Sequence, residues 1–162
     1  NKSLQGTPTS RPVVPEGLSQ RRITFTGDQK FPGLQGPRFC LRTSTDGSMI
    51  YFLMKDEEGI VQVFEVAVHG GEIRKVTNLP ASVQAQFNVS PDGQSLAIIA
   101  ENSIWVTNIK SGKTTRVTEK TDDDNAPVVA VNWNHTGNML VYNRYTGAGS
   151  NRYLQIFKIK LN

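Results

Sequence analysis

Two stretches of the chain repeat one order of features and decide the fold. Residues Phe87 to Glu119 read FNVSPDGQSLAIIAENSIWVTNIKSGKTTRVTE, and residues Leu41 to Asn78 read LRTSTDGSMIYFLMKDEEGIVQVFEVAVHGGEIRKVTN. A third unit, VNWNHTGNMLVYNRYTGAGSNRYLQIFKIKLN from Val131 to Asn162, follows the same order but stops earlier in it. Each unit is a run of short apolar segments separated by turn residues, which predicts antiparallel strands joined by hairpins.

The turn glycines of these units set the period of the repeat. Gly47, Gly93 and Gly137 lie 46 and then 44 residues apart. Repeats of roughly 40 to 50 residues made of short strands are typical of β-propeller blades, which are four-stranded antiparallel sheets. The sequence therefore predicts an all-β fold in which blades occupy residues 41–78, 87–119 and 131–162.

Within a unit, each segment has the pattern expected of its place in a blade. The first strand ends in a Ser-x-Asp-Gly turn, where Asp caps the turn and Gly accepts a positive φ. The second segment, Met49–Met54 or Leu96–Ala100, is apolar throughout, which indicates a strand buried on both faces. The fourth strand is short and ends in the pair Val76-Thr77 or Val117-Thr118, with basic residues that suit an outer edge.

The two ends of the repeat array do not match. Arg21 to Thr24 copies a fourth strand without the three strands that precede one, and the third unit ends after its third strand. We therefore expect residues 1–20 to be a linker or long loop, residues 21–26 to be a lone outer strand, and residues 21–162 to form the propeller part. An unpaired outer edge invites pairing with another strand, so we expect residues 21–26 to pair with such an edge either within the ring of a longer native chain, which is the favoured origin, or across two copies of this chain as a homodimer.

Composition limits the classes of function. The chain has 162 residues, a formal net charge of +4 and basic residues that are scattered along it. The sequence has no basic stripe with interleaved aromatic residues, so it does not indicate a nucleic-acid partner. It also has no apolar run that is long enough to span a membrane. The single cysteine, Cys40, lies in an apolar run and is expected to be a core residue.

The repeated stretches resemble the TolB-like propeller repeat. That repeat has a Ser-Pro-Asp-Gly turn, an apolar strand, an Ile-Trp or Ile-Tyr strand, a Gly turn and a Val-Thr ending, and the resemblance covers residues 23–162. The stretches QRRITFTGDQKFPGL, FLMKDEEGIVQVFEV and GGEIRKVTN are similar more narrowly to the uncharacterised bacterial YidR-like family, as its C-terminal portion. The resemblance implies a ring of six or seven blades, of which about three are present here, and it carries no established activity.

Few residues are suited to catalysis or metal binding. The two histidines, His69 and His135, lie in hairpin turns, so neither a catalytic triad nor a zinc site is indicated. The acidic run Thr121 to Asn125 lacks the ligand spacing of a calcium loop. The sequence predicts no cofactor, no metal and no catalytic residue.

Binding residues are expected where the loops between blades converge on the channel mouth. Aligned on the repeat turns, Arg38, Gln84 and Val128 occupy equivalent places in these loops, with Gln86 close to them. Guanidinium and amide groups bind sugars, peptide tails and anions. The predicted ligand-binding residues are Arg38, Gln84, Gln86 and Asp124.

These observations favour a binding or interaction scaffold whose partner is a protein segment or an oligosaccharide. The alternative is a carbohydrate-active lyase or hydrolase with a channel active site completed by blades outside this sequence. Whether the chain is an enzyme stays open at this stage. The TolB-like resemblance favours a periplasmic location, with a cytoplasmic one as the alternative.

Overall fold

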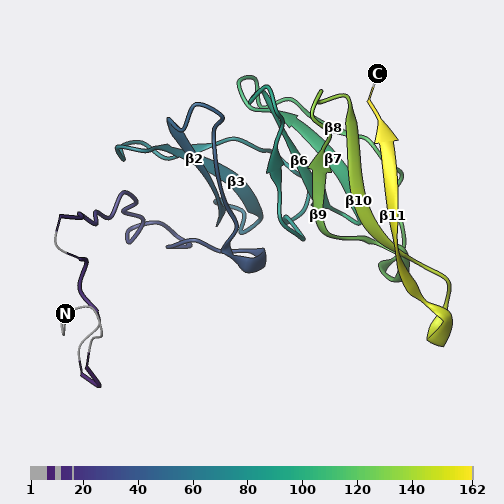
Figure 1. The fold of residues 1–162 in the computed structure, drawn as a ribbon, viewed down its shortest axis with the longest axis horizontal. Helices are drawn as coiled ribbons and strands as arrows, with labels where there is room; N and C mark the ends of the chain where they lie inside the picture. Colours follow the sequence, from purple (N-terminus) through teal and green to yellow (C-terminus); the bar gives the residue numbers. More distant parts are fainter. Residues whose placement is uncertain (1–6, 10–11, 16, 162) are drawn as a thin grey trace.

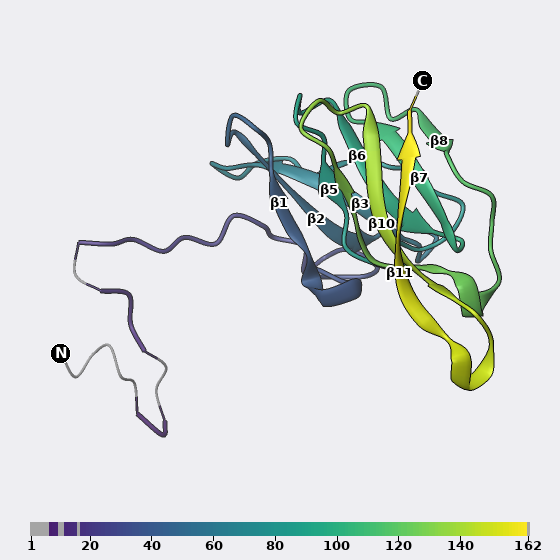
Figure 2. The same cartoon turned by 45° about the vertical axis from the view of Figure 1, so that its right-hand side comes forward.

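The computed structural model describes residues 7–9, 12–15 and 17–161, and within them the regular structure consists of three antiparallel sheets and short 3₁₀ turns. The sheets lie side by side in chain order, as Figures 1 and 2 show. The first and second sheets have four strands each and the third has three. The fold is all-β, and its sheets are meanders in which each strand pairs with the next, as the repeat predicted.

The strands begin and end close to the predicted segments. The first sheet consists of β1 (Leu41–Thr43), β2 (Met49–Lys55), β3 (Val61–Ala67) and β4 (Arg74–Lys75). The second consists of β5 (Asn88–Val89), β6 (Ser95–Ala100), β7 (Ser103–Asn108) and β8 (Thr114–Arg116). The third consists of β9 (Pro127–Trp133), β10 (Met139–Thr146) and β11 (Tyr153–Lys160), and the 3₁₀ turns are η2 (Pro37–Phe39), η3 (Asp123–Asn125) and η4 (Gly149–Asn151).

The Ser-x-Asp-Gly turns form as their residues dictate. The Asp92 carboxylate accepts hydrogen bonds from the Ser90 hydroxyl and from the Gln94 N–H, and the Ser90 hydroxyl oxygen accepts the Ser95 N–H at 2.9 Å. In the third unit Asn134 takes the place of the serine, and its amide oxygen accepts the Met139 N–H at 2.9 Å. A side-chain oxygen therefore closes the turn in every sheet, although the third turn has no carboxylate.

The second sheet is buried on both faces because it lies between the other two. Leu96, Ile98 and Ala100 of β6 belong to a core shared with the first sheet. Ala97 and Ile99, which alternate with them, belong to a core shared with the third sheet. Because successive side chains of a strand point to opposite faces, a strand between two cores must be apolar at every position.

A repeated contact, which we call the Val-Thr clamp, fastens the fourth strand to the third. In the first sheet the Val76 N–H donates to the Val63 carbonyl at 2.9 Å, and the Val63 N–H donates to the Thr77 hydroxyl oxygen at 2.9 Å. In the second sheet Val117 and Thr118 hold Ile104 in the same way, at 2.8 and 2.9 Å. The clamp gives the recurring Val-Thr pair of the sequence a structural role.

The third sheet differs from the prediction at its start. Strand β9 begins at Pro127 rather than at Val131, because Pro127 and Val128 pair with Arg144 and Asn143 beyond an irregularity in the ladder. Val129 has a φ of 72° there, a conformation that a β-branched residue rarely adopts. The innermost strand of this sheet is thereby extended toward the loops that join the sheets.

Residues 21–26 have no strand assignment and run beside the first sheet. Ile23 and Leu34 pack on the face of that sheet that is turned away from the second sheet, against Phe52 and Phe64. None of the strands that the structure describes pairs with residues 21–26, so their role as an outer strand stays a prediction. Every helical segment in the described ranges is a three-residue 3₁₀ turn, far too short to cross a bilayer.

Candidate ligand-binding site at the channel mouth

Three of the four predicted binding residues line one hollow between the sheets. Arg38, from the turn before β1, meets Gln84 and Gln86, from the loop before β5, in a hollow of about 260 Å³. Val128 and Val129 at the start of β9 complete its wall. The Gln86 N–H donates to the Val129 carbonyl at 3.0 Å, which ties the second loop to the third sheet. Loops that are far apart in sequence therefore converge on this one place.

Strained backbone concentrates around this hollow. Arg38 and Phe39 have φ values of 53° and 47°, and Val129 has one of 72°. Such conformations cost free energy in residues other than glycine and persist where the surrounding structure requires them. Val129, which lines the hollow, has an exposed side chain, as has Phe39, the residue that follows Arg38.

Gln84 has a structural role that the sequence did not reveal. Its side-chain amide donates to the Asn102 side-chain oxygen at 2.9 Å, and its side-chain oxygen accepts the Asn102 N–H at 2.8 Å. Asn102 lies in the tight turn between β6 and β7 and donates to the Asp123 carboxylate at 2.7 Å. Gln84 therefore braces the wall of the hollow.

Arg38 and Gln86, in contrast, have side chains that are free to bind. Across the residues that the structure describes, neither side chain takes part in a hydrogen bond or ion pair with another residue. A guanidinium offers a planar fork of donors, and a carboxamide offers both donors and an acceptor. These two side chains can thus bind a carboxylate, a peptide group or a sugar hydroxyl.

A second hollow of about 430 Å³ adjoins the first and shares Gln84 with it. Glu101, Asn102, Lys120 and Asp123 line it, and Lys120 lies 3.9 Å from the Glu101 carboxylate. In the sequence, only the tight turn at Glu101 and Asn102 could have indicated the residues that line this second hollow. The loops from the fourth strands and the β6–β7 turn reach the same end of the sheets, which is why the two hollows adjoin.

Asp124 is not part of either hollow. Its carboxylate lies 3.7 Å from the Arg152 guanidinium, and its side chain is largely exposed. The neighbouring Asp122 caps η3 by accepting the Asn125 N–H at 2.8 Å. In the described part of the chain no three His, Cys, Asp or Glu side chains group as metal ligands would. Hydrogen bonds among its own residues thus hold the acidic loop in place. The loop puts Asp123, rather than Asp124, beside Gln84.

A row of polar side chains continues from the hollow along the innermost strands. We call Arg42, Asn88 and Asn132 the inner polar row, since each stands two residues before the turn-closing Ser44, Ser90 or Asn134. The Arg42 guanidinium donates to the Asn88 side-chain oxygen at 2.7 Å, and the Asn88 amide donates to the Asn132 side-chain oxygen at 2.9 Å. The innermost strands of a propeller line its central channel, so this row gives that wall a polar surface.

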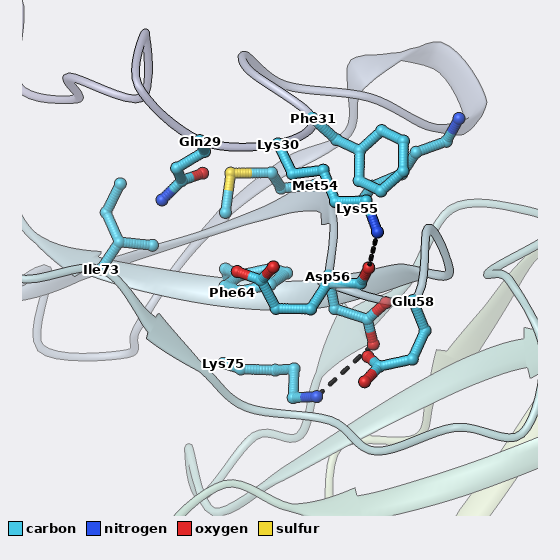
Figure 3. Close-up of a pocket in the computed structure, with 11 residues that line it drawn as sticks. Gln29, Lys30, Phe31, Met54, Lys55, Asp56, Glu58, Phe64, Ile73 and Lys75 are labelled. Atoms are coloured by element: carbon cyan, nitrogen blue, oxygen red, sulfur yellow. Dashed lines mark hydrogen bonds and ion pairs between the residues drawn. The ribbon is translucent and has the colours of Figure 1, made fainter.

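The hollow in Figure 3 has a different character. It lies on the outward face of the first sheet under residues 29–31, with Met54, Phe64 and Ile73 as its apolar part. The Lys75 ammonium lies 3.4 Å from the buried Asp56 carboxylate, a contact within the first sheet. The Lys30 ammonium donates to the Glu57 carbonyl at 2.9 Å, which fastens the N-terminal segment to the turn between β2 and β3.

The sequence and fold match known propeller proteins. The family model described as the dipeptidyl peptidase IV (DPP IV) N-terminal region matches residues 41–133, which is more than half of the chain. The chain belongs to that family. The match includes the first two sheets and β9, and so covers the part of the molecule that carries Gln84, Gln86 and the inner polar row.

Among curated proteins, the uncharacterised protein YidR of Escherichia coli K12 is 39% identical to this chain over 117 residues. The aligned part is 72% of this chain and 28% of YidR. This confirms the expected similarity to YidR, and this chain spans well under half the length of that relative.

Solved structures confirm the TolB-like propeller fold. TolB from Acinetobacter baumannii aligns with a TM-score of 0.55 at 18% identity, over 75% of this chain and 30% of that one. The oligogalacturonate lyase of Vibrio parahaemolyticus aligns with a TM-score of 0.62 at 11% identity, over 86% of this chain and 40% of that one. At such identities the similarity shows a shared fold only.

Proposed function

We propose that the chain is a binding module of a TolB-like propeller, and that its channel mouth holds a segment of another protein in extended conformation. The observation that carries the proposal is the meeting of Arg38, Gln84 and Gln86 in one hollow, where Arg38 and Gln86 have no partner among the described residues. Propeller loops commonly carry the binding residues of the fold.

The chemistry of the hollow favours a peptide as the occupant. The carboxamide of Gln86 matches the donor and acceptor of a peptide group, while Arg38 matches a carboxylate such as a C-terminus or an acidic side chain. The exposed side chain of Val129, which lines the hollow, offers an apolar contact to the side chains of such a segment. An acidic oligosaccharide shares the carboxylate but makes less use of this apolar contact.

Arg38→Ala and Gln86→Ala test the proposal, with fluorescently labelled acidic peptides and oligogalacturonate as the probes. Loss of a hydrogen bond to a charged group costs roughly 1.5 to 3 kcal/mol, so Arg38→Ala is expected to weaken peptide binding by about tenfold or more in fluorescence polarisation. Gln84→Ala serves as the control, because it removes the brace to Asn102 and should lower the unfolding midpoint as well as affinity.

Two outcomes contradict the proposal. Equal binding of every probe to the wild-type chain and to the Arg38→Ala, Gln86→Ala double variant shows that the hollow is not the binding site. Cleavage of oligogalacturonate by the chain, with or without added manganese, shows that it acts as a lyase rather than as a peptide-binding module.

A further inference from the structure

The hollow that holds Arg38 and Gln86 is small and has one kind of charge. Its volume of about 260 Å³ lies just below the range of about 300 to 1,000 Å³ that is usual for ligand pockets. Arg38 is the only charged residue among the described residues that line it. A hollow of this size accommodates the end of a chain or one side chain, and not a long stretch of backbone. Its occupant brings a single negative group to the guanidinium.

Much of the remaining wall is apolar. Pro37, Ala85, Val128 and Val129 line the hollow beside Arg38. Ala85 is buried, whereas the Val129 side chain is available to a ligand because 47% of the residue is exposed. The group that reaches the guanidinium therefore meets an apolar surface directly beside the charge.

Val129 has a costly backbone conformation that its own surroundings do not explain. Its φ is 72°, which a β-branched residue rarely adopts, and a glycine would adopt it without strain. Burial is not the reason for a valine here, because the side chain is exposed. The Val129 carbonyl accepts the Gln86 N–H at 3.0 Å, which holds the residue in place. Strained backbone at an exposed apolar residue indicates that the side chain serves an interaction.

The turn that carries Arg38 is held at both of its ends. A Cβ atom at Gly36 would lie 2.9 Å from Val61 Cγ1 and 3.0 Å from Leu53 Cδ1, so the chain lies directly on the first sheet there. Cys40, at the other end of the turn, is buried. Between these two points Arg38 has a φ of 53°. The backbone of Arg38 is therefore fixed before a ligand arrives, which lowers the entropic cost of binding.

The C-terminus of a chain fits these features better than an acidic side chain does. In a C-terminal residue, one Cα atom carries the carboxylate, the side chain and the N–H of the last peptide group. The carboxylate matches the donor fork of Arg38, the N–H matches the amide oxygen of Gln86, and an apolar side chain matches Val129. An internal aspartate or glutamate brings a carboxylate on a methylene stem and leaves the apolar wall without a side chain to contact.

We propose that the hollow binds the free C-terminus of another protein, and that the last residue of this partner is a valine or a leucine. The inference rests on the proposed function and narrows the partner from an extended segment to a chain end. Arg38 pairs with the terminal carboxylate, and Gln86 accepts the N–H of the last peptide group. Val128 and Val129 contact the last side chain. Capture of a C-terminal carboxylate is a recurring mode of peptide recognition.

Fluorescence polarisation with three labelled peptides and the full 162-residue chain tests the proposal. The first peptide ends in leucine with a free carboxylate. The second is its C-terminal amide, and the third is an amide that carries an internal glutamate. The free acid is expected to bind most tightly, and amidation should weaken binding by about tenfold or more, because it removes a charge-assisted pair. The internal glutamate should not restore the affinity.

Two variants separate the contacts. Arg38→Ala should abolish the preference for the free acid over the amide. Val129→Gly should weaken binding of the free acid by roughly threefold or more, because an apolar contact is lost. The same variant should not lower the unfolding midpoint, since glycine relieves the strained φ. Val68→Gly removes another exposed valine, in the turn between β3 and β4, and is expected to leave the affinity unchanged.

The possible contrary results separate this inference from the proposed function. If the internal-glutamate amide binds as tightly as the free acid and Arg38→Ala weakens both, the hollow is a peptide site without a preference for a C-terminus. If no peptide binds the wild-type chain, or if Arg38→Ala leaves binding unchanged, the proposed function fails together with the inference. Unchanged affinity of Val129→Gly for the free acid contradicts the contact with the last side chain.

Discussion

The first and third sheets each have a face that no other sheet covers, and the two faces differ. On the first sheet, Phe52 is 1% exposed because Ile23 and Leu34 of the N-terminal segment pack over it. On the third sheet, Ile156 is 77% exposed at the edge of β11. Figure 1 shows the N-terminal segment on the side of the first sheet and β11 at the opposite end of the row of sheets. An irregular segment can thus bury the apolar face of a sheet in place of a neighbouring blade. The backbone groups at the edge of a strand, in contrast, need another strand as their hydrogen-bonding partner.

The largest effect is expected from truncating one apolar residue at each end. Phe52→Ala removes a buried ring and should lower the free energy of unfolding by roughly 3 to 5 kcal/mol. Ile156→Ala, measured by urea denaturation at a concentration where the chain is monomeric, should change it by about 0.5 kcal/mol or less. A comparable loss in both variants contradicts the claim that only one of these faces is covered.

Substitution in the Val-Thr clamp is expected to have a smaller effect on the free energy of unfolding, and it again separates the first sheet from the other end of the comparison. Thr77→Val leaves the Val63 N–H without an acceptor and also removes a hydrogen bond to the Gln62 side chain, at a cost of about 1 to 3 kcal/mol. Thr24→Val should leave the stability unchanged, because the Thr24 hydroxyl makes no hydrogen bond to another residue that the structure describes. Thermal unfolding of both variants measures the difference. A monomer destabilised as strongly by Thr24→Val would show that Thr24 already has a partner.

The turns provide the smallest contrast, which depends on pH. The Ser44 hydroxyl, followed by the N–H and hydroxyl of Ser48, lowers the pKa of Asp46 from 3.8 to about 2. Because the folded pKa lies below the ordinary value, the stabilisation is present above pH 3.8 and is lost as the pH falls through about 2. The third sheet has Thr136 at this position and gains no such dependence.

Carboxyl chemical shifts followed by NMR check this prediction. The Asp46 resonance is expected to titrate with a midpoint near 2, and Asp46→Asn should make acid unfolding less steep. The same approach applies to Asp92, whose pKa is lowered first by the Ser90 hydroxyl and then by the Gln94 N–H. A midpoint at or above 3.8 for Asp46 would mean that these hydrogen bonds do not form in solution.

The fold could be predicted from sequence because its determinants are local. The Ser-x-Asp-Gly turns, the apolar second strands and the Val-Thr pairs each specify a place in a meander within a few residues. The start of β9 at Pro127 could not be predicted, since it depends on a positive φ at Val129 that a β-branched residue rarely adopts.

The site was predictable only in part. Alignment on the repeat turns brought Arg38, Gln84 and Gln86 together, because equivalent loops of a propeller meet at one end. It could not separate the bracing residue from the free ones, since the hydrogen bonds of Gln84 go to a turn 18 residues away. Asp124 was predicted because it lies in the channel-face loop of residues 119–130, and the structure instead directs it toward Arg152.

Hydrogen exchange at three backbone amides tests the central claim, that Val63, Ile104 and Ile156 occupy equivalent positions in their hairpins and that, among the described residues, a Val-Thr clamp holds only the first two. In the dilute monomer, the amides of Val63 and Ile104 are expected to exchange slowly, whereas the amide of Ile156 exchanges nearly as fast as in an unfolded chain. Full protection of Ile156 in a monomer of confirmed mass, or rapid exchange at Val63 and Ile104, would contradict the account.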